Sequence, residues 1–316
     1  MIIAIPDDYQ NCVHTLNCFK KTKGHSVRIY QDHIQEIKEL VNRFYDVEAI
    51  VLTRERTSLD RELLSRLPNL KIISQTGKIS SHVDIAACKE FGITVADGSG
   101  SGTATAELGI LLILASLRNL VQEVSRLQGG SWQGTLGRQL NKKVLGVYGY
   151  GRIGQQICSI GQSFGANILV WGRESSLTKA AKDGFSVAKS KSDFFRSCDI
   201  ISLQIRLTSD TKAIVTADDL ALMKQDAILV NTSRAELIQI NALENALKAG
   251  RPGFAAIDVF ESEPILGANH PLLKLNNCLC TPHLGFVEKD NYETYFGLAF
   301  DNINAFAAGK PINVIV

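Results

Sequence analysis

Short apolar stretches rich in β-branched residues alternate with longer amphipathic stretches along almost the whole chain. We predict that the short stretches are strands, at residues 2–5, 27–30, 49–52, 70–74, 144–149, 168–171, 200–203, 228–231 and 254–258. Strands that alternate with helices form parallel sheets covered by helices on both faces. A continuously apolar strand such as 227–231 also fits a sheet that is buried on both sides. The pattern therefore predicts an α/β fold with parallel sheets.

A segment rich in Gly and Ser, residues 95–103, separates the predicted strands into two groups. Such a composition is typical of a hinge or linker. A helical pattern with one apolar face follows, from about residue 104 to 127. Its most apolar part, residues 108–117, is shorter than the roughly 20 residues of a membrane span, so we predict a buried helix. A last helix is predicted over 288–308, before an extended tail.

The length of 316 residues favours two domains. The 34 Lys and Arg residues nearly balance the 32 Asp and Glu residues, and a net charge of +2 lacks the basic excess of nucleic-acid-binding proteins. The seven cysteines are scattered and odd in number, which is typical of reduced thiols in the cytoplasm. The first residues lack the basic and long apolar regions of a signal peptide. We therefore predict a cytoplasmic protein that binds neither nucleic acid nor membranes.

Two of the cysteines, Cys278 and Cys280, form a C-x-C motif. The motif has no second ligand pair at the spacing of a zinc site, so we predict no metal. We interpret the two cysteines as strand residues that lie on the same face of a sheet.

The predicted strand at 144–149 runs directly into a glycine-rich G-x-G-x-x-G motif, which a helical pattern follows. Gly149 permits the tight turn, Gly151 lets a pyrophosphate approach the backbone, and Gly154 lets the helix pack closely on the strand. Free N–H groups at the helix N-terminus attract the phosphates. The motif therefore predicts a dinucleotide site. The whole loop is assigned to the cofactor: Gly149, Tyr150, Gly151, Arg152, Ile153 and Gly154.

The next predicted strand is followed by Gly172 and Arg173. An NAD site usually has an Asp or Glu here, which binds the ribose 2′-hydroxyl. Without that carboxylate a 2′-phosphate meets no repulsion, and Arg173 can pair with it. We therefore favour NADP over NAD. The alternatives are that Arg173 is a solvated loop residue or stacks on the adenine of NAD, with Glu174 reaching a hydroxyl.

Three charged residues, Arg234, Glu263 and His283, follow later strands of the second group. Ligands bind beyond the carboxyl ends of the strands in open α/β sheets, so these residues can line one cleft with the glycine-rich loop. Taken singly they are a solvated arginine, a surface acid and a turn histidine. Taken together behind a dinucleotide site, they favour a catalytic role.

The motifs G-x-G-R-I-G, N-T-S-R, D-V-F-x-x-E-P and T-P-H-x-G occur in this order between residues 149 and 285. With them the chain resembles the D-isomer-specific 2-hydroxyacid dehydrogenases, a family that includes phosphoglycerate dehydrogenase and the glyoxylate/hydroxypyruvate reductases. The resemblance covers nearly the whole chain and is densest from about residue 70 to 286. It implies a catalytic triad of Arg234, Glu263 and His283. In the reduction of a 2-keto acid by hydride transfer, His283 would give and recover the proton, Glu263 would orient the imidazole, and Arg234 would bind the substrate carboxylate. The resemblance also implies an NAD(P)H-dependent enzyme that interconverts a small 2-keto acid and its D-2-hydroxy acid.

The resemblance implies further contacts with the nicotinamide end of the cofactor. Asp258 is expected to accept a hydrogen bond from the carboxamide, with Thr232 and Gly285 nearby. The alternative is that Asp258 only caps the turn after its strand.

The segment Gly77-Lys78-Ile79 matches the loop that binds the substrate carboxylate through backbone N–H groups in this family. The usual pattern has a second glycine where Ile79 stands. Lys78 could meet a distal acid group of the substrate, or it could point to solvent.

The positions of the motifs change the two-domain picture. They lie between about 100 and 287, so we expect a cofactor domain at 100–287, inserted into a substrate-binding domain made of 1–99 and 288–316. Both are expected to be Rossmann-like or flavodoxin-like parallel-sheet domains. The resemblance also implies a homodimer built around the helix after the hinge, with Trp132 at the interface.

Two other functions fit the same fold. The formate-oxidising branch of the family has Gln instead of Glu beside the histidine, so Glu263 argues against that reaction. A catalytically weak dinucleotide-sensing protein would need only the cofactor loop, so the three charged residues argue against it.

Overall fold

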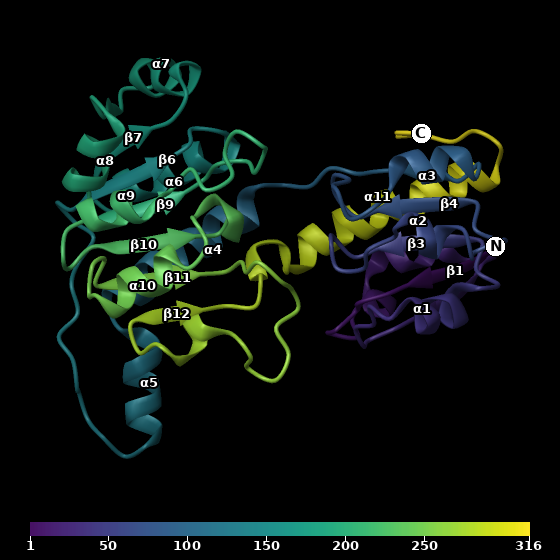
Figure 1. The fold of residues 1–316 in the computed structure, drawn as a ribbon, viewed down its shortest axis with the longest axis horizontal. Coiled ribbons are helices and arrows are strands. Elements are labelled where there is room, and N and C mark those ends of the chain that lie inside the picture. Colours follow the sequence, from purple (N-terminus) through teal and green to yellow (C-terminus); the bar gives the residue numbers. More distant parts are fainter. The chain divides into compact units, whose positions relative to one another are not determined.

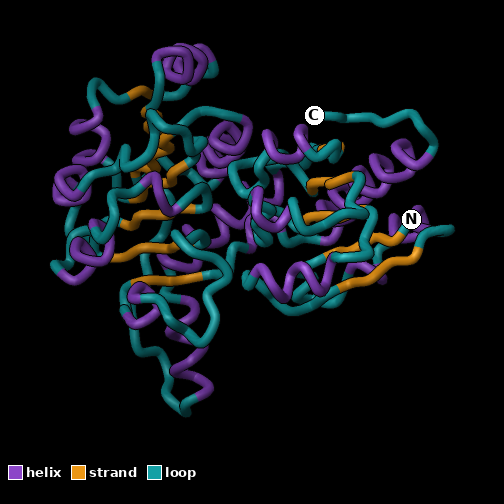
Figure 2. Tube along the Cα trace, turned by 45° about the vertical axis from the view of Figure 1, so that its right-hand side comes forward, coloured by secondary structure: helices purple, strands orange, loops and turns teal.

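The computed structural model describes residues 1–316, which divide into two compact units. The first unit contains Met1–Ser101 and Val287–Val316, and the second contains Gly102–Phe286. Each unit is a parallel β-sheet flanked by helices (Figures 1 and 2). The predicted α/β fold with two parallel sheets is confirmed. The expected domain limits, at 99/100 and 287/288, lie within two residues of the limits of these units.

The sheet of the first unit has five strands in the order β2-β1-β3-β4-β5. Their bounds are β1 (Ile2–Ile5), β2 (Ser26–Ile29), β3 (Ala49–Leu52), β4 (Ile72–Gln75) and β5 (Thr94–Ala96). The helices before α11 are the 3-10 helices η1 (Val13–Thr15) and η2 (Asn17–Thr22) and the α-helices α1 (Ile37–Phe44), α2 (Arg61–Leu64) and α3 (Ile85–Glu90). One core cluster joins α1, α2 and α3 to the sheet and includes Phe44, Leu52, Leu63 and Cys88.

The long helix α11 (Lys289–Ala307) returns the chain to the first unit. Its Phe296 and Phe300 are buried, and Asn302 Nδ2 donates to Ser74 Oγ at 3.1 Å and to the Asp97 carbonyl at 3.3 Å. The tail then pairs with β5 through two backbone hydrogen bonds, Val95 N–H to Val316 and Ile315 N–H to Val95. The first unit is therefore built from both ends of the chain.

The sheet of the second unit has seven strands in the order β12-β11-β10-β9-β6-β7-β8. Their bounds are β6 (Val144–Tyr148), β7 (Asn167–Trp171), β8 (Ser186–Val187), β9 (Ile200–Leu203), β10 (Ile228–Asn231), β11 (Phe254–Ile257) and β12 (Cys278–Cys280). This is the Rossmann order, and the strand order reverses between β6 and β9. Ligands of such sheets bind beyond the carboxyl ends of the strands at this switch point.

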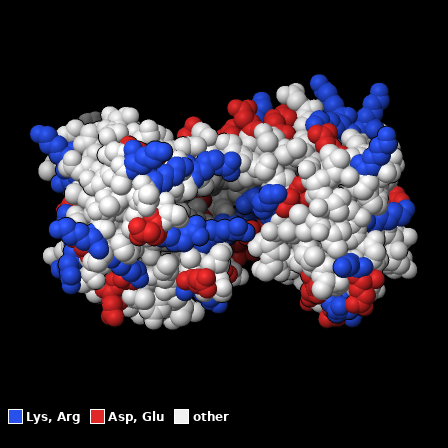
Figure 3. Space-filling model, turned by 90° about the horizontal axis from the view of Figure 1, so that it is seen from above, with Lys and Arg blue, Asp and Glu red and all other residues white.

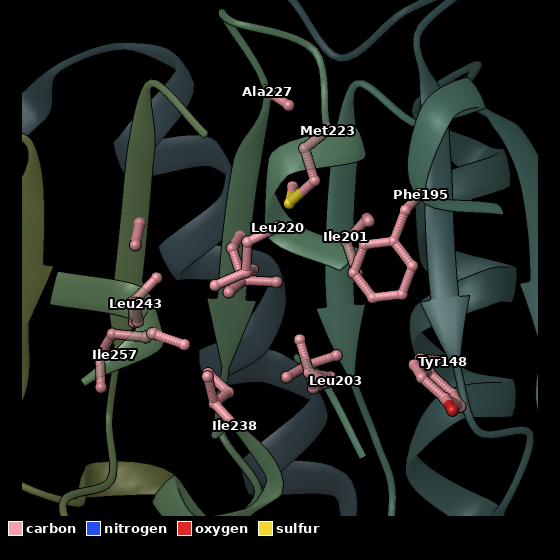
Figure 4. Close-up of a cluster of buried hydrophobic side chains, with 14 of the residues drawn as sticks. Tyr148, Phe195, Ile201, Leu203, Leu220, Met223, Ala227, Ile238, Leu243 and Ile257 are labelled. Carbon is pink, nitrogen blue, oxygen red and sulfur yellow. The ribbon is translucent and has the colours of Figure 1, made fainter. Parts of the chain in front are cut away.

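Helices cover both faces of the second sheet. One face packs against α8 (Lys191–Ser197), α9 (Ala217–Leu222) and α10 (Ala242–Lys248) through a large apolar cluster. Figure 4 shows this cluster, in which Phe195, Leu220 and Leu243 from the helices pack with strand residues such as Leu203 and Ile257. A second cluster joins the other face to α4 (Thr103–Leu117), α6 (Arg152–Ser163) and α7 (Glu174–Lys182). Three further 3-10 helices are η3 (Ala235–Leu237), η4 (Pro271–Lys274) and η5 (Leu284–Phe286).

The single helix predicted over 104–127 is wrong. The chain leaves α4 at Leu117 and enters α5 (Leu120–Gln128) through Asn119, whose φ of 48° is left-handed. The two helices are bent by 61°. Most of α4 lies inside the second unit, as predicted, whereas α5 has no buried residue. No single helix is long and apolar enough to cross a membrane, although this bent pair passes the same length and composition test when taken together.

Two short strands, β5 and β8, lie outside the strands predicted above. Strand β12 consists of the C-x-C motif, so the interpretation of Cys278 and Cys280 as strand residues is confirmed. All seven cysteines are free thiols.

Charges of both signs occur on the surface of each unit. On the face drawn in Figure 3, Lys and Arg side chains are interspersed with Asp and Glu side chains. This distribution agrees with a net charge of only +2.

Candidate active site

The glycine-rich loop follows β6 and has the shape of a phosphate cradle. Gly149 has a φ of +101°, and a side chain there would collide with the Gln204 carbonyl. A side chain at Gly154 would collide with the Gly149 carbonyl, so both positions require glycine. By contrast, the space beside Gly151 is open, and no side chain caps the N–H groups of α6 that follow it. The loop therefore fits a pyrophosphate, which would occupy that space and accept hydrogen bonds from those N–H groups.

The sequence assigned Tyr150 to the cofactor, but its side chain packs inside the unit. Its ring is buried and meets Phe185 edge-on, with ring centroids 5.9 Å apart. Its hydroxyl donates to Asp183 Oδ2 at 2.9 Å, and Asp183 is the C-cap of α7. Burial and this carboxylate both raise the pKa of Tyr150. The side chain therefore braces the loop against α7, and only the backbone of Tyr150 faces the cradle.

The adenosine end of the site is formed where β7 meets α7. Gly149 N–H donates to the Trp171 carbonyl at 2.8 Å, which ties the glycine-rich loop to the end of β7. Gly172 follows, and Arg173 is the N-cap of α7. The Arg173 side chain is exposed and makes no ion pair. It is therefore available to an anionic ligand.

His283 and Glu263 form a hydrogen-bonded pair. His283 lies between β12 and η5 with a left-handed φ of 52°, which is unusual for a residue with a side chain. Its Nδ1 is 2.6 Å from Glu263 Oε2, and because a carboxylate only accepts, Nδ1 carries the proton. Glu263 Oε1 accepts from the Phe260 N–H at 2.9 Å, so the carboxylate is held from both sides. Both side chains are 14% exposed, and His283 Nε2 is left for a ligand.

Asp258 is fully buried at the end of β11 and organises the turn that carries His283. Its Oδ1 accepts from Thr281 Oγ1 at 2.6 Å and from Leu284 N–H at 2.7 Å. Its Oδ2 accepts from Gly285 N–H at 2.9 Å. Desolvation raises the pKa of Asp258, although these hydrogen bonds act in the opposite direction. Asp258 thus binds the turn of its own chain, as in the alternative given above, and Gly285 is packed against it rather than exposed.

Arg234 lies after β10 in a turn fixed by Asn231. Asn231 Nδ2 donates to the Arg234 carbonyl at 2.8 Å, and its Oδ1 accepts from Ser233 N–H at 3.0 Å. Arg234 is half-buried and donates to the Ser233 carbonyl at 2.7 Å. Thr232 is buried, and its hydroxyl accepts from Gln204 Nε2 at 3.1 Å. The parallel strands β10, β11 and β12 are neighbours, so their carboxyl ends form one edge of the sheet. Arg234, Glu263 and His283 all come after this edge.

The segment Gly77-Lys78-Ile79 lies after β4 in the first unit, and Asp97 is a partner of two of its residues. Lys78 Nζ pairs with Asp97 Oδ1 at 2.8 Å, so Lys78 is not an unpaired cation. The Ile79 N–H already donates to Asp97 Oδ2 at 3.3 Å. The backbone N–H groups of Gly77 and Lys78 make no such bond. Sequence reasoning missed Asp97, whose only signal was its place after the β5 stretch.

Gly77 has a φ of +91°, a conformation that favours glycine. A side chain there would also collide with the guanidinium of Arg54, which lies over the Tyr295 ring at 5.4 Å. Arg54 was not among the predicted site residues, and no sequence motif pointed to it.

Comparison with known proteins gives one family. Residues 110–285 match the family model described as "D-isomer specific 2-hydroxyacid dehydrogenase, NAD binding domain". A glyoxylate reductase of Aeropyrum pernix is 33% identical, over 92% of this chain and 95% of that protein. A hydroxypyruvate reductase of Blautia hydrogenotrophica is 30% identical, over 89% of each. The crystal structure of phosphoglycerate oxidoreductase from Vibrio cholerae O395 is 48% identical with a TM-score of 0.95, and the match covers 98% of this chain and 99% of that one. The chain therefore belongs to the D-isomer specific 2-hydroxyacid dehydrogenases, and residues 110–285 form its NAD-binding domain.

Proposed function

We propose that the protein is an NAD(P)H-dependent oxidoreductase that interconverts a small 2-keto acid and its D-2-hydroxy acid. The observation that carries the proposal is the His283–Glu263 pair, which lies at the same sheet edge as the phosphate cradle within one unit. The relatives named above are reductases of glyoxylate and hydroxypyruvate, which are both small 2-keto acids. This agreement supports the substrate class and leaves the particular acid to experiment.

The bound nicotinamide supplies the hydride in this reaction. Glu263 holds Nδ1–H of His283, so in the protonated imidazole the second proton sits on Nε2 and is directed away from the carboxylate. From there it passes to the substrate oxygen as negative charge develops on it, and in the reverse direction Nε2 accepts it back. Arg234 is always charged, so it binds the substrate carboxylate and stabilises the charge on the neighbouring oxygen.

Other residues hold the cofactor and the substrate. The cradle of Gly149, Gly151 and Gly154 takes the pyrophosphate, and Arg152 and Ile153 begin the helix behind it. Asp258, Thr232 and Gly285 are assigned to the nicotinamide end of the site, where Asp258 holds the turn that carries Gly285. Free backbone N–H groups at Gly77 and Lys78 support the assignment of that segment to the substrate carboxylate.

The cofactor is proposed to be NADP(H) rather than NAD(H). No carboxylate stands at the end of β7, where an Asp or Glu would bind a ribose 2′-hydroxyl and repel a 2′-phosphate. Arg173 at the start of α7 is exposed and makes no ion pair, so its guanidinium can pair with the phosphate.

The protein is further proposed to be a cytoplasmic homodimer. Helix α5 presents four apolar side chains that are about half exposed or more: Leu120, Val121, Val124 and Leu127. Trp132, which follows the helix, is 76% exposed. A face of this kind is typical of an interface, and a second copy of the chain is the occupant that the family implies. Seven free thiols support a reducing compartment.

Purified protein with NADPH should lose nicotinamide absorbance when it meets at least one small 2-keto acid. The panel should contain glyoxylate, hydroxypyruvate, pyruvate and longer 2-keto acids, each tested with NADPH and with NADH. If no member of the panel is reduced with either cofactor, the oxidoreductase proposal fails and a dinucleotide-sensing protein becomes the better explanation.

His283→Asn should lower kcat by about 10²–10⁴-fold, because the proton donor is lost. Binding of NADPH, measured by fluorescence titration, should stay unchanged. His270→Asn is a matched control, since His270 Nε2 lies 3.2 Å from Glu261 in a second His–Glu pair of the same unit. Equal losses in the two variants would argue against a role for His283 in proton transfer.

Arg173→Ala should weaken NADPH binding by about tenfold or more, because a charge-assisted pair with the 2′-phosphate is removed. NADH binding should hardly change. Lys182→Ala removes an exposed positive charge from the other end of the same helix and serves as the control. Titration of each variant with both cofactors makes the comparison, and a similar weakening for NADPH and NADH would refute the assignment.

Leu127→Glu should convert the dimer to a monomer, because it places a charge in the apolar face of α5. Sedimentation equilibrium measures the mass of each species. Gln128→Glu adds the same charge at the neighbouring exposed position and should leave the dimer intact. A wild-type monomer, or a Leu127→Glu variant that stays dimeric, would contradict an interface at α5.

A further inference from the structure

The two thiols of the C-x-C motif lie next to each other on β12. The Sγ atoms of Cys278 and Cys280 are 3.6 Å apart, and both residues are half-buried. They face the apolar cluster shown in Figure 4, whereas Leu279 between them packs with the cluster on the other face of the sheet. No group of three potential metal ligands occurs in the protein. The proposed reaction uses neither thiol.

The strand that carries the thiols leads directly into the active site. β12 is an edge strand that pairs only with β11, through Cys278 with Ala255 and Cys280 with Ile257. The next residue, Thr281, donates its N–H to Ile257 and its hydroxyl to Asp258. A change in the path of β12 is therefore passed to the turn that holds His283.

We propose that Cys278 and Cys280 are an oxidisable dithiol, and that closure of a disulfide between them displaces His283 and switches the enzyme off. The switch rests on the proposed role of His283, whereas formation of the disulfide does not. The oxidant is a peroxide.

The reaction runs in two steps. The Cys280 thiolate attacks one peroxide oxygen and the O–O bond breaks, which gives a sulfenic acid and hydroxide. The hydroxide takes up the proton that the Cys280 thiol had released and leaves as water. Cys278 Sγ then attacks Cys280 Sγ, the S–S bond forms, and the sulfenic oxygen leaves as a second water. The two thiols lose two electrons and two protons in total, and the peroxide is reduced to water. Reduction by an external dithiol reverses the change.

The order of the two steps follows from the contact between the sulfurs. A hydrogen bond from the Cys278 thiol lowers the pKa of Cys280, and the same contact with burial raises that of Cys278. Cys280 is therefore the thiolate that reacts first, since the thiolate is the nucleophile. Burial instead raises the pKa of Cys12, a half-buried thiol of the first unit, to about 11.

The disulfide requires the strand to shorten. Its sulfurs must approach from 3.6 Å to a bond of about 2.05 Å. Side chains at alternate positions of an extended strand leave the backbone on the same face, roughly 6.6 Å apart, whereas the Cβ atoms of a disulfide lie about 3.8 Å apart. The contraction weakens the pairing with β11 and moves the start of the His283 turn. A displacement of about 1 Å at a reacting group can cost about 100-fold in rate.

The test is to treat the reduced, full-length protein with hydrogen peroxide. Peptide mass analysis should find a disulfide that joins Cys278 and Cys280 within one chain. Hydrogen exchange at Leu284 and Gly285, whose N–H groups are bonded to Asp258, should become faster. Turnover should fall by about 100-fold and return with dithiothreitol. Cys278→Ser and Cys280→Ser should each abolish these responses, and Cys12→Ser should keep them.

The outcomes separate the proposals. A bond between other cysteines, a bond between two chains, or equal inactivation of the Cys278→Ser/Cys280→Ser double variant overturns the dithiol. A disulfide at the expected place with unchanged turnover overturns the switch. If the reduced protein turns over no substrate, the proposed function fails, and the mass and exchange measurements still decide whether the dithiol closes and moves the turn.

Discussion

The proposed active site depends on the hydrogen bonds of the buried Asp258 carboxylate, at the carboxyl ends of β11 and β12. A carboxylate without exposure to water is costly unless donors compensate it, and here a hydroxyl and two backbone N–H groups do so. All three donors come from residues 281–285, so this turn has to close around Asp258. The closed turn holds His283 in a left-handed conformation and brings Nδ1 to Glu263. The geometry of the proposed acid is therefore a consequence of a neighbouring buried charge.

The cofactor end of the same sheet is organised by close packing instead of by charge. Gly149 and Gly154 occur where any side chain would strike a backbone carbonyl, so the turn and the helix behind it can approach each other only at these positions. Tyr150 adds a polar link from the loop to the end of α7, the helix that begins at Arg173. The phosphate cradle is thus tied to the C-terminal end of the helix whose N-cap is Arg173.

The first unit is a complete fold although the second unit is inserted into its sequence. The chain departs after residue 101 and returns at residue 287, and α11 then supplies part of the core. Asn302 joins this helix to β4 and to the segment after β5 in one set of buried hydrogen bonds. These bonds link residues about two hundred positions apart, so they form only when both ends of the chain are in place.

The sequence by itself determined the fold class, the phosphate loop and the three charged residues at the sheet edge. These features depend on local patterns: apolar strands of regular spacing, glycines at set positions, and polar residues directly after strands. Only the tertiary structure decided the pairing of Lys78 with Asp97, the inward direction of Tyr150 and the donors that Asp258 accepts from. It also decided the break at Asn119, where helix propensity continues but burial ends. The reason is the same in each case: a side chain's partner is set by contacts between distant segments, and no local pattern of one segment contains that information.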